Sequence, residues 1–414
     1  MQGPGRGALP GFYNRGAGDG KSMDRTAGPL WAMGLMSGTS MDGVDAAWLS
    51  TDGDTIAAFG PVAEVAPAYA APERALLAAA GEAAAAAIAR GEAPGGATLR
   101  AATAVVDWVH AAAVTILSAR SDTPPDVVGY HGQTVFHAPD AGRTVQLGDG
   151  AALARAAGCP VVSDFRSADM AAGGQGAPLA PFFHWALARH VGEAAPVAFL
   201  NIGGVANVTW VDPAAPAPEA DGALLSFDTG PGNALIDDWM TAHGAGPHDR
   251  DGAAAAAGRV ATDRMRGNAL AAFLDRPPPK SLDRNAFSAV SRGLDGMSLS
   301  DGAATLTALT ADCVAAADRH MPRPVARWLV AGGGRRNPTL MRMLAERLPA
   351  PVVPVEAAGL DGDMLEAQAF AHLAVRVARG LPTSCPGTTG VRAGVSGGTI
   401  SRPGSKVSAI GGRL

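Results

Sequence analysis

A short segment near the start of the chain gathers hydroxyls, carboxylates and glycines into one turn. The apolar run 30–36 leads into a loop of small residues, and a second run with apolar residues at alternate positions follows it. The loop consists of Gly38, Thr39, Ser40, Met41, Asp42, Gly43, Val44 and Asp45. In a strand–turn–strand arrangement, its backbone N–H groups, hydroxyls and carboxylates could surround a phosphate chain and the Mg²⁺ that accompanies it.

Two better-known phosphate-binding motifs do not fit this segment. No Gly-Lys-Ser or Gly-Lys-Thr follows, which excludes a Walker loop, and a strand rather than a helix follows the turn, which excludes a dinucleotide-binding fingerprint. An ordinary hairpin turn is the alternative, because glycine, serine and aspartate are common in turns. Either Asp42 or Asp45 could reach Mg²⁺, directly or through water, and the sequence does not decide between them.

Two further carboxylates stand at the ends of expected elements. Asp228 closes an apolar strand in SFDTGPGN. It could take a proton from an attacking water, or it could merely cap the following turn. Glu366 lies near the start of the last long helix, where it could contact a ligand or be a solvated acid favoured by the helix dipole.

The pattern of expected elements repeats along the chain. A hairpin at 30–50 and a strand at 55–65 are followed by two helices, over 72–91 and 97–120, and then by strands and a short helix. The second half begins with another hairpin, at 197–211, whose turn contains Gly203, Gly204 and Asn207. Strand–loop–helix units follow in both halves, including one with the loop Gly332, Gly333 and Gly334. We therefore expect an internally duplicated α/β protein whose two hairpins face one cleft.

Composition bounds the function. The chain has 414 residues and a net charge of −5, so it lacks the basic footprint of a nucleic-acid binder. Three distant cysteines match no metal spacing and favour a reducing cytoplasm. We expect no membrane partner, because no apolar run reads as long enough to span a bilayer. Residues 1–28 read as a disordered extension and residues 401–414 as a flexible tail.

Eight ordered blocks sharpen the reading: GLMSGTSMDGVDAA, GYHGQTVFH, VQLGDG, SDFRSAD, GGQGAPLAPFFH, LNIGGVANV, SFDTGPGNALIDDW and VAGGGRRNPTLM. Together they resemble the anhydro-N-acetylmuramic acid kinase family, within the superfamily of actin, sugar kinases and heat-shock chaperone ATPases. The resemblance implies a two-lobed actin-like (RNase H-like) α/β fold with an interdomain cleft. Lobe I would span 29–160, completed by the helix at about 364–390, and lobe II would span 161–363.

The resemblance also implies an activity and assigns roles. The enzyme would use ATP, with Mg²⁺, to phosphorylate O6 of 1,6-anhydro-N-acetylmuramic acid while water opens the bridge at C1. The reaction would belong to peptidoglycan recycling in the cytoplasm. Asp228 would be the base, and both hairpins and the triple-glycine loop would hold the nucleotide. The sugar would contact Glu366, Arg166, Asp169, Gln175, His131, Gln133, Lys280 and Asn233, with Arg166 or Lys280 facing the lactyl carboxylate.

Two segments depart from the family pattern. SDFRSAD keeps Arg166 but lacks the usual cluster of arginines, and PPPKSLDRNAF keeps Lys280, Ser281, Arg284 and Phe287. Both segments would lie near the sugar, so these departures concern the substrate contacts rather than the nucleotide site. The alternatives are a related kinase or phosphohydrolase acting on another small carbohydrate, and a non-catalytic ATP-dependent sensor. The sequence leaves open whether the protein is a homodimer.

Overall fold

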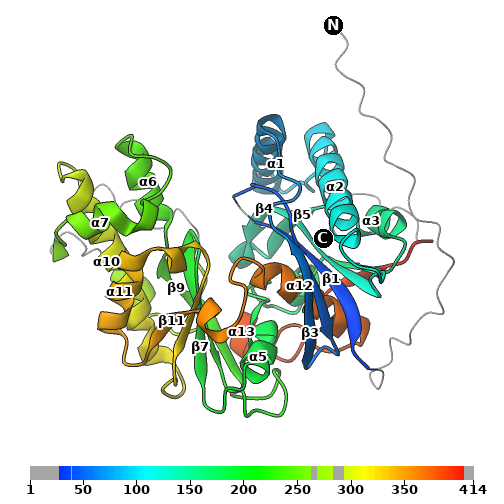
Figure 1. Cartoon of the computed structure of the whole chain (residues 1–414). Helices are drawn as coiled ribbons and strands as arrows, with labels where there is room; N and C mark the ends of the chain where they lie inside the picture. The colour runs from blue at the N-terminus through cyan, green and yellow to red at the C-terminus, as the bar shows by residue number, and fades with distance from the viewer. Residues whose placement is uncertain (1–27, 39, 263–267, 283–292, 405–414) are drawn as a thin grey trace, which may run out of the picture.

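The chain folds into two α/β lobes that lie side by side in Figure 1. The structure, a computed structural model, describes residues 28–38, 40–262, 268–282 and 293–404. Thr39, Arg284 and Phe287, and all but the last residue of the expected extension, therefore lie outside the described residues.

Lobe I is built on a seven-stranded sheet. Its strands follow the order β12-β6-β4-β1-β2-β3, and β5 pairs with β4. The strands β1, β2 and β3 form an antiparallel meander, whereas β4 and β6 run parallel to β1. The strand bounds are β1 (Leu30–Ser37), β2 (Asp45–Thr51), β3 (Ile56–Ala63), β4 (Val127–Ala138), β5 (Arg143–Leu147), β6 (Val161–Ser163) and β12 (Thr399–Ser401).

The second sheet repeats the core of the first. Its order is β11-β10-β7-β8-β9, in which β7, β8 and β9 form an antiparallel meander and β10 and β11 run parallel to β7. The bounds are β7 (Val197–Ile202), β8 (Val205–Val211), β9 (Leu224–Pro231), β10 (Trp328–Ala331) and β11 (Val352–Pro354). Two sheets with the same strand order confirm the duplicated, actin-like α/β fold expected from the sequence.

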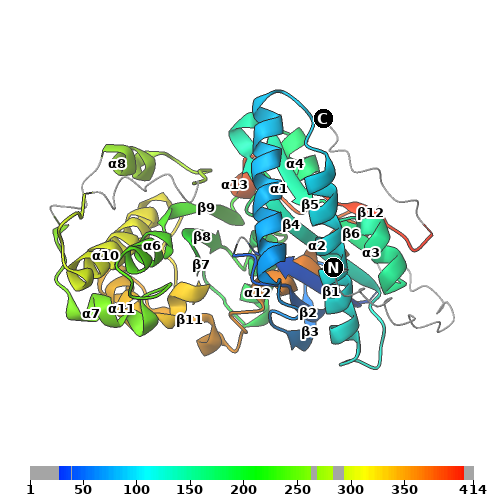
Figure 2. The ribbon, with the colours of Figure 1, turned by 90° about the horizontal axis from the view of Figure 1, so that it is seen from above.

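Helices cover both sheets and fill the space between them (Figures 1 and 2). On lobe I they are α1 (Ala71–Ala89), α2 (Ala97–Ser118), α3 (Gly150–Ala157) and α4 (Ser167–Ala171). On lobe II they are α6 (Ala234–Ala242), α7 (Ala253–Ala257), α8 (Asn268–Asp275), α10 (Leu299–Ala317) and α11 (Pro338–Arg347). Between the sheets lie α5 (Pro181–His190) and α12 (Leu365–Ala378), followed by α13 (Pro386–Thr389). Short 3₁₀ turns are η1 (Pro139–Ala141), η2 (Arg250–Gly252), η4 (Asp318–His320), η5 (Gly333–Arg336) and η6 (Val355–Ala358).

One apolar core joins the lobes. It combines inner-face residues of both sheets with buried side chains of α5 and α12. The helix α12 lies directly on the backbone of β1 and β4 because both strands have a glycine at the crossing. A Cβ on Gly34 would lie 1.8 Å from the carbonyl oxygen of Ala367, and one on Gly129 would lie 2.1 Å from that of Phe370. This contact fixes α12, and with it Glu366, relative to the first sheet.

Several expectations require correction. The strand β6 pairs with β4, so lobe I continues past residue 160, and β12 extends it to Ser401, inside the expected tail. The HGQT segment, residues 131–134, lies within β4. The 22-residue helix α2 is long and apolar enough to cross a bilayer by length and composition, contrary to our expectation. Ten of its residues are nevertheless buried against lobe I, as in a core helix.

Candidate active site

The side chain of Gln133, in β4, holds the turn between β1 and β2 through two hydrogen bonds. The Oγ of Ser37 donates a hydrogen bond of 2.6 Å to Oε1 of Gln133, and Nε2 of Gln133 donates one of 3.0 Å to the carbonyl of Gly38. The same carbonyl accepts the N–H of Met41, whose φ of 54° is left-handed. The Gln133 side chain is 1% exposed. It therefore shapes the turn, and any contact with the sugar would need its position to change.

The far end of this turn packs against the loop that follows β3. A Cβ on Gly43 would lie 2.6 Å from the carbonyl oxygen of Pro67, so the backbones can approach only because residue 43 is glycine. Val44 is buried, whereas Ser40 and Asp42 are exposed. Asp45 accepts the N–H of Val65 at 2.7 Å. The turn thus presents one exposed and one half-buried carboxylate.

Asp45 lies in an electronegative environment. Burial raises its pKa, and the charges of Glu64 and Asp363 raise it further. Within the described residues, no group of three or more potential metal ligands occurs. Mg²⁺ typically takes one or two protein carboxylates and completes its shell with water and phosphate oxygens. Asp42 and Asp45 fit that donor set.

The second hairpin has a tight turn of two glycines. The carbonyls of Gly203 and Gly204 accept the N–H groups of Asn233 and Gly232 at 2.8 and 2.9 Å. The turn's own N–H groups donate to no backbone carbonyl within the part of the chain that the structure describes. Gly232 allows this approach, because a Cβ there would lie 2.3 Å from the Gly203 oxygen. The turn therefore directs its carbonyls towards α6 and leaves its N–H groups available to an anion.

The triple-glycine loop after β10 lies against the same strand end. Gly332 has a φ of 71°, and a Cβ there would lie 2.4 Å from Oδ1 of Asn201. A Cβ on Gly334 would lie 2.5 Å from the Ile202 side chain. Asn233 donates its Nδ2 to the Ile202 carbonyl at 3.1 Å. The second hairpin, the GPGN loop and the triple-glycine loop are therefore neighbours, as the resemblance implies for a nucleotide site.

Three polar residues form a row across lobe II. Asn201 pairs with Asn207 on β7 and β8, and Asn207 pairs with Asp228 on β9. In the next row along the sheet, the hydroxyls of Thr209 and Ser226 hydrogen-bond each other, and the Thr209 hydroxyl also hydrogen-bonds Nδ1 of His184 in α5. Since side chains alternate along a strand, the polar row faces the same way, towards lobe I. Sequence reasoning missed Asn201, although its i+6 spacing from Asn207 across a two-glycine turn could have revealed the pairing.

Asp228 combines partial burial with few stabilising contacts. Its Oδ2 accepts the Leu282 N–H at 2.7 Å. Burial raises its pKa to about 7, although this hydrogen bond and the charge of Arg276 favour the ionised form. A carboxyl that titrates near neutrality can accept a proton at physiological pH. Asp228 is therefore chemically suited to be a general base.

Lobe I contains a cation and a neutral imidazole that lie next to each other. Arg166, at the start of α4, donates to the Gly176 carbonyl at 2.8 Å and approaches Nε2 of His131 at 3.1 Å. Burial and the Arg166 charge lower the pKa of His131 to about 3, so the ring is neutral and Nε2 can accept. Burial lowers the pKa of Arg166 to about 10, which leaves it charged.

The carboxyl of Glu366 interacts electrostatically with two lobe I residues, Asp45 of the first hairpin and Arg166. Its side chain is exposed to solvent, but the protein around it desolvates the carboxyl and raises its pKa. The charge of Asp45 raises that pKa further, whereas Arg166 lowers it. Glu366 thus connects the first hairpin to the Arg166 region.

Asp169 and Gln175 hold the neighbouring loop together. Both oxygens of Asp169 are occupied: Oδ1 accepts the Gly176 N–H at 2.6 Å, and Oδ2 accepts the hydroxyls of Ser384 and Thr389. Gln175 donates its backbone N–H to the Thr389 carbonyl. Asp169 is 1% exposed, so its effect on a sugar would act through the loop. The half-buried Gln175 side chain could contact a sugar directly.

Lys280 is near Asp228 through its backbone but not through its ammonium group. The Lys280 carbonyl accepts the Asp228 N–H at 3.0 Å. Its Nζ is buried and donates to the carbonyls of Phe273 and Leu274, at the end of α8, at 3.1 and 3.0 Å. Burial lowers its pKa to about 8. Of the two cations considered for a substrate carboxylate, Arg166 is therefore the one whose charge acts on Glu366.

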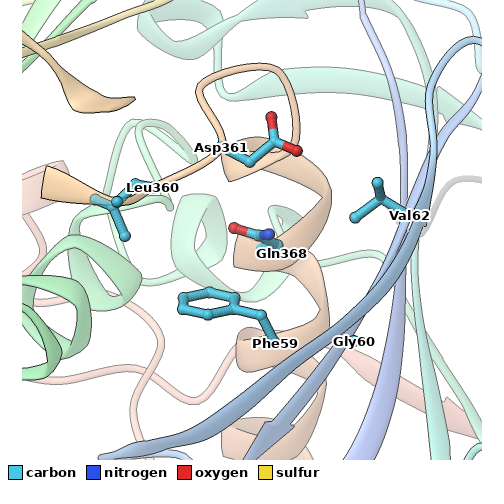
Figure 3. A pocket seen from close by; sticks show the side chains of 7 residues that line it. Phe59, Gly60, Val62, Leu360, Asp361 and Gln368 are labelled. Atoms are coloured by element: carbon cyan, nitrogen blue, oxygen red, sulfur yellow. The ribbon is translucent and has the colours of Figure 1, made fainter. Parts of the chain in front are cut away.

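The structure also contains a separate pocket beside α12. Figure 3 shows it between β3 and the segment that leads into α12, with Phe59, Val62, Leu360, Asp361 and Gln368 around it. Its volume is about 210 Å³. None of the residues predicted to bind the sugar or the nucleotide lines it.

Comparisons with known proteins place the chain in a family. The model of the family "Anhydro-N-acetylmuramic acid kinase" matches residues 31–403. A relative from Jannaschia sp. (strain CCS1), named anhydro-N-acetylmuramic acid kinase 1, is 52% identical over 380 residues, covering 91% of this chain and 96% of its own. A relative from Cereibacter sphaeroides, named anhydro-N-acetylmuramic acid kinase, is 54% identical over 376 residues, covering 91% of this chain and 97% of its own.

Solved structures are more distant. The activator of the 2-hydroxyisocaproyl-CoA dehydratase from Clostridium difficile, with bound ADPNP, has 12% identity and a TM-score of 0.41, covering 85% of this chain and 96% of its own. A ROK family glucokinase from Streptomyces griseus has 15% identity and a TM-score of 0.37, covering 83% and 99%. The family match and the curated relatives decide the assignment: the chain belongs to the anhydro-N-acetylmuramic acid kinase family.

Proposed function

We propose that this chain is an ATP-dependent kinase that opens 1,6-anhydro-N-acetylmuramic acid and yields N-acetylmuramic acid 6-phosphate. Family membership supplies the substrate class. The observation that carries the chemistry is Asp228, a half-buried carboxyl on the lobe I side of β9 whose pKa is raised to about 7. This group has the basicity to accept a proton from water, and general-base assistance typically contributes about 10²–10⁴-fold in rate.

The reaction joins two bond changes. Water loses a proton to Asp228 as its oxygen bonds to C1 of the sugar, and the C1–O6 bond breaks. O6 then carries the electron pair that attacks the γ-phosphorus of ATP, and ADP leaves with the electrons of the broken P–O bond. The developing charge on O6 is taken up by the new phosphate ester, so only the water needs a base.

Lobe I residues are suited to hold the sugar. Arg166 is charged and half-buried, and a lactyl carboxylate would replace part of its lost solvation with an ion pair. Glu366 is exposed next to it and could accept hydrogen bonds from sugar hydroxyls. His131 is neutral and would line the site without taking part in proton transfer. The roles assigned to Gln175 and Asn233 stay predictions.

The two hairpins and the triple-glycine loop would bind ATP. The N–H groups of Gly203 and Gly204 suit the phosphates, and Gly332–Gly334 would lie along the adenosine. Asp42 or Asp45 would hold Mg²⁺, directly or through water, and the bound ion would neutralise charge on the phosphates. Thr39 belongs to the same proposed set.

Catalysis requires the lobes to approach. Within the described residues, the interactions of Asp228 are with Leu282, Lys280 and Arg276, all of lobe II, and none joins it to Arg166 or Glu366. Closure would bring the base to the sugar and exclude bulk water from the γ-phosphate. Small-angle scattering should show a smaller radius of gyration with sugar plus a nucleotide analogue. An unchanged radius, with binding confirmed, would argue for a preformed cleft.

The substrates also suggest a setting. ATP is a cytoplasmic compound, and the product is a phosphorylated amino sugar of cell-wall origin. We therefore place the reaction in the cytoplasm, in peptidoglycan recycling. Nucleic acid and membrane have no role in this proposal, and it does not depend on whether the protein is a homodimer.

Product analysis in ¹⁸O-water tests the proposal. Purified protein with ATP, Mg²⁺ and anhydromuramate should give a sugar 6-phosphate with one ¹⁸O at C1. Immediate borohydride reduction prevents anomeric exchange, and unlabelled product in the same water measures any that remains. Phosphorylation without ¹⁸O would contradict hydrolytic opening, and turnover of another sugar in preference would support the alternative carbohydrate kinase. Nucleotide binding without turnover would favour the sensor.

A further inference from the structure

Arg335, next to the triple-glycine loop, has a buried guanidinium that joins three segments. Its side chain is 5% exposed. Its Nη1 donates to the Gly332 carbonyl at 3.0 Å, its Nε donates to Glu356 at 2.7 Å, and its Nη2 pairs with Asp363 at 2.9 Å. We call this group, Arg335 with Gly332, Glu356 and Asp363, the Arg335 bridge.

The partners of the bridge come from both sides of the site. Gly332 belongs to the loop proposed to hold adenosine, and Glu356 lies in η6 of lobe II. Asp363 lies in the segment that crosses to lobe I, three residues before Glu366. The next residue, Met364, is 1% exposed and packs in a cluster with Ala47 of β2. The bridge thus connects the nucleotide loop to the anchored beginning of α12.

The space for the guanidinium depends on Gly362. A Cβ at that position would lie 2.5 Å from Nε of Arg335 and 2.7 Å from its Cζ. The same Cβ would lie 2.7 Å from Oε1 of Glu356, so an alanine at 362 would displace the Arg335–Glu356 pair and leave every charge in place. Gly362 is therefore a means of testing the position of Arg335 separately from its charge.

We infer that Arg335 is a positioning residue for the kinase reaction, which couples the nucleotide loop of lobe II to the start of α12 and so to Glu366. The inference rests on the proposed function for the identity of the ligands. Arginine suits this task because its planar group can donate to three acceptors in fixed directions, whereas lysine offers a compact charge without that geometry. Removing it would leave Asp363 and Glu356 without this cation and free the Gly332 carbonyl.

The test compares Arg335→Ala, Arg335→Lys and Gly362→Ala with the wild-type protein. We expect Arg335→Ala to raise the KM for ATP roughly 5–20-fold and the KM for the sugar roughly 3–10-fold, while kcat stays within about threefold, as for lost ground-state positioning. Arg335→Lys should restore only part of the loss. Arg342→Ala, which removes an exposed arginine paired with Glu346 on α11, is the matched control and should leave all three constants unchanged.

A double-mutant cycle separates positioning from a general loss of stability. Gly362→Ala should weaken binding in the wild-type background and have a much smaller effect in the Arg335→Ala background, since the guanidinium is then absent and the Glu356 carboxylate, no longer paired with it, can turn away from the new Cβ. Unchanged KM values with a lower kcat and melting temperature would overturn the inference in favour of a structural ion pair. A raised KM for ATP alone would overturn the link to α12, and additive effects would overturn the role of Gly362.

A binding readout keeps the test independent of turnover. The dissociation constant of a fluorescent ATP analogue, measured without sugar, should rise in Arg335→Ala by the same factor as the KM for ATP. If the wild-type protein bound the analogue but made no sugar phosphate, the proposed function would fail while the bridge was still tested. If the analogue bound both proteins equally, the bridge would fail while the proposed function stood.

Discussion

The two hairpins occupy equivalent positions in sheets of the same order, yet they differ in chemistry. The turn of lobe I spans residues 38–44 and contains a left-handed Met41 and the carboxylate Asp42, and Asp45 follows it as the first residue of β2. The turn of lobe II consists of two glycines, and the polar residues beside it are the amides Asn201 and Asn207. Lobe I therefore presents negative charge, and lobe II presents N–H groups and amides.

This difference indicates how a duplicated fold divides one reaction. Negatively charged phosphates are repelled by carboxylates unless a metal ion stands between them, so the lobe I hairpin suits Mg²⁺ and the lobe II hairpin suits the phosphates themselves. On the sugar side the division is reversed. In the proposed site, lobe I contributes the cation Arg166, whereas lobe II contributes Asp228, the proposed base. Changes in lobe II should therefore affect chemistry and nucleotide, and changes in lobe I should affect metal and sugar.

The largest effect expected is at Asp228. Asp228→Asn keeps the size of the side chain and can still accept the Leu282 N–H, but it removes the base. We expect kcat to fall roughly 10²-fold or more, with ATP and sugar affinities nearly unchanged. In the wild-type protein kcat should rise with pH through an apparent pKa near 7, because the base must be ionised. Steady-state kinetics from about pH 5 to 9 measures both.

Asp221→Asn is the control for this change. Asp221 is an exposed carboxylate just before β9 and takes no part in the site. It should leave kcat and its pH profile as they are. Near-full turnover in Asp228→Asn, with both ligands bound, would make Asp228 a turn cap and Glu366 the leading candidate for the base.

The second effect concerns the glycine that supports the lobe II turn. Gly232→Ala would put a Cβ against the Gly203 carbonyl, a backbone atom that cannot rotate away. Overpacking of this kind typically costs about 1–3 kcal/mol, and we expect the affinity for ATP to fall roughly 10–30-fold as the turn shifts. Isothermal titration with a nucleotide analogue measures this. Gly95→Ala, with room for its methyl, is the control; an equal affinity in Gly232→Ala would separate this turn from the nucleotide.

A third change tests the charge of lobe I. Asp42→Asn and Asp45→Asn each remove one carboxylate from the first hairpin. We expect the Mg²⁺ concentration for half-maximal activity to rise roughly tenfold in the variant that loses the ligand, and less in the other. Titration of activity with Mg²⁺ at saturating sugar distinguishes the two. Asp140→Asn, at an exposed position, should not alter the requirement, and an unaltered requirement in both test variants would remove the metal from this hairpin.

The sequence predicted the elements that local pattern controls. Hairpins built around small-residue turns and the helices over α1 and α2 follow from periodicity, and the structure confirms them. The repeated hairpins also predicted the duplicated sheets, because equivalent elements in both halves imply one topology. The eight blocks in order predicted the family.

Contacts between distant segments could not be read in the same way. The lobe boundary was wrong because pairing of β6 with β4, and of β12 with β6, has no local signal. Gln133 and Lys280 were expected at the sugar, but their side chains are engaged by Gly38 and by the end of α8. The Arg335 bridge joins Arg335 to Glu356 and Asp363, which are 21 and 28 residues further along the chain, and nothing in the sequence reveals these partners.

A fourth, smaller effect is expected at Glu366. Glu366→Gln keeps the size of the side chain but removes the negative charge that interacts with Arg166. We expect the KM for the sugar to rise roughly fivefold, the KM for ATP to change little, and kcat to fall by less than the loss at Asp228. Glu346→Gln, an exposed change on α11, is the control. A loss of kcat equal to that of Asp228→Asn would contradict the division between binding in lobe I and chemistry in lobe II.

The smallest effect concerns stability and compares two carboxyl groups, the half-buried Asp228 of lobe II and the buried Asp169 of lobe I. The folded pKa of Asp228, about 7, exceeds its unfolded value, so the folded protein holds a proton that the unfolded chain has released. Stability contributed by this group is therefore lost as pH rises through about 7. Asp228→Asn avoids that loss and should melt a few degrees above wild type at about pH 8, with the difference shrinking towards about pH 5.

Asp169→Asn should instead melt lower at both pH values, because its new NH₂ group would face the hydroxyls of Ser384 and Thr389 or the Gly176 N–H, all of which now donate to the carboxylate. Calorimetry of both variants at the two pH values measures this. A lower melting temperature for Asp228→Asn at about pH 8 would mean that its ionised carboxyl is well stabilised, and a base so stabilised would be too weak for the role proposed here.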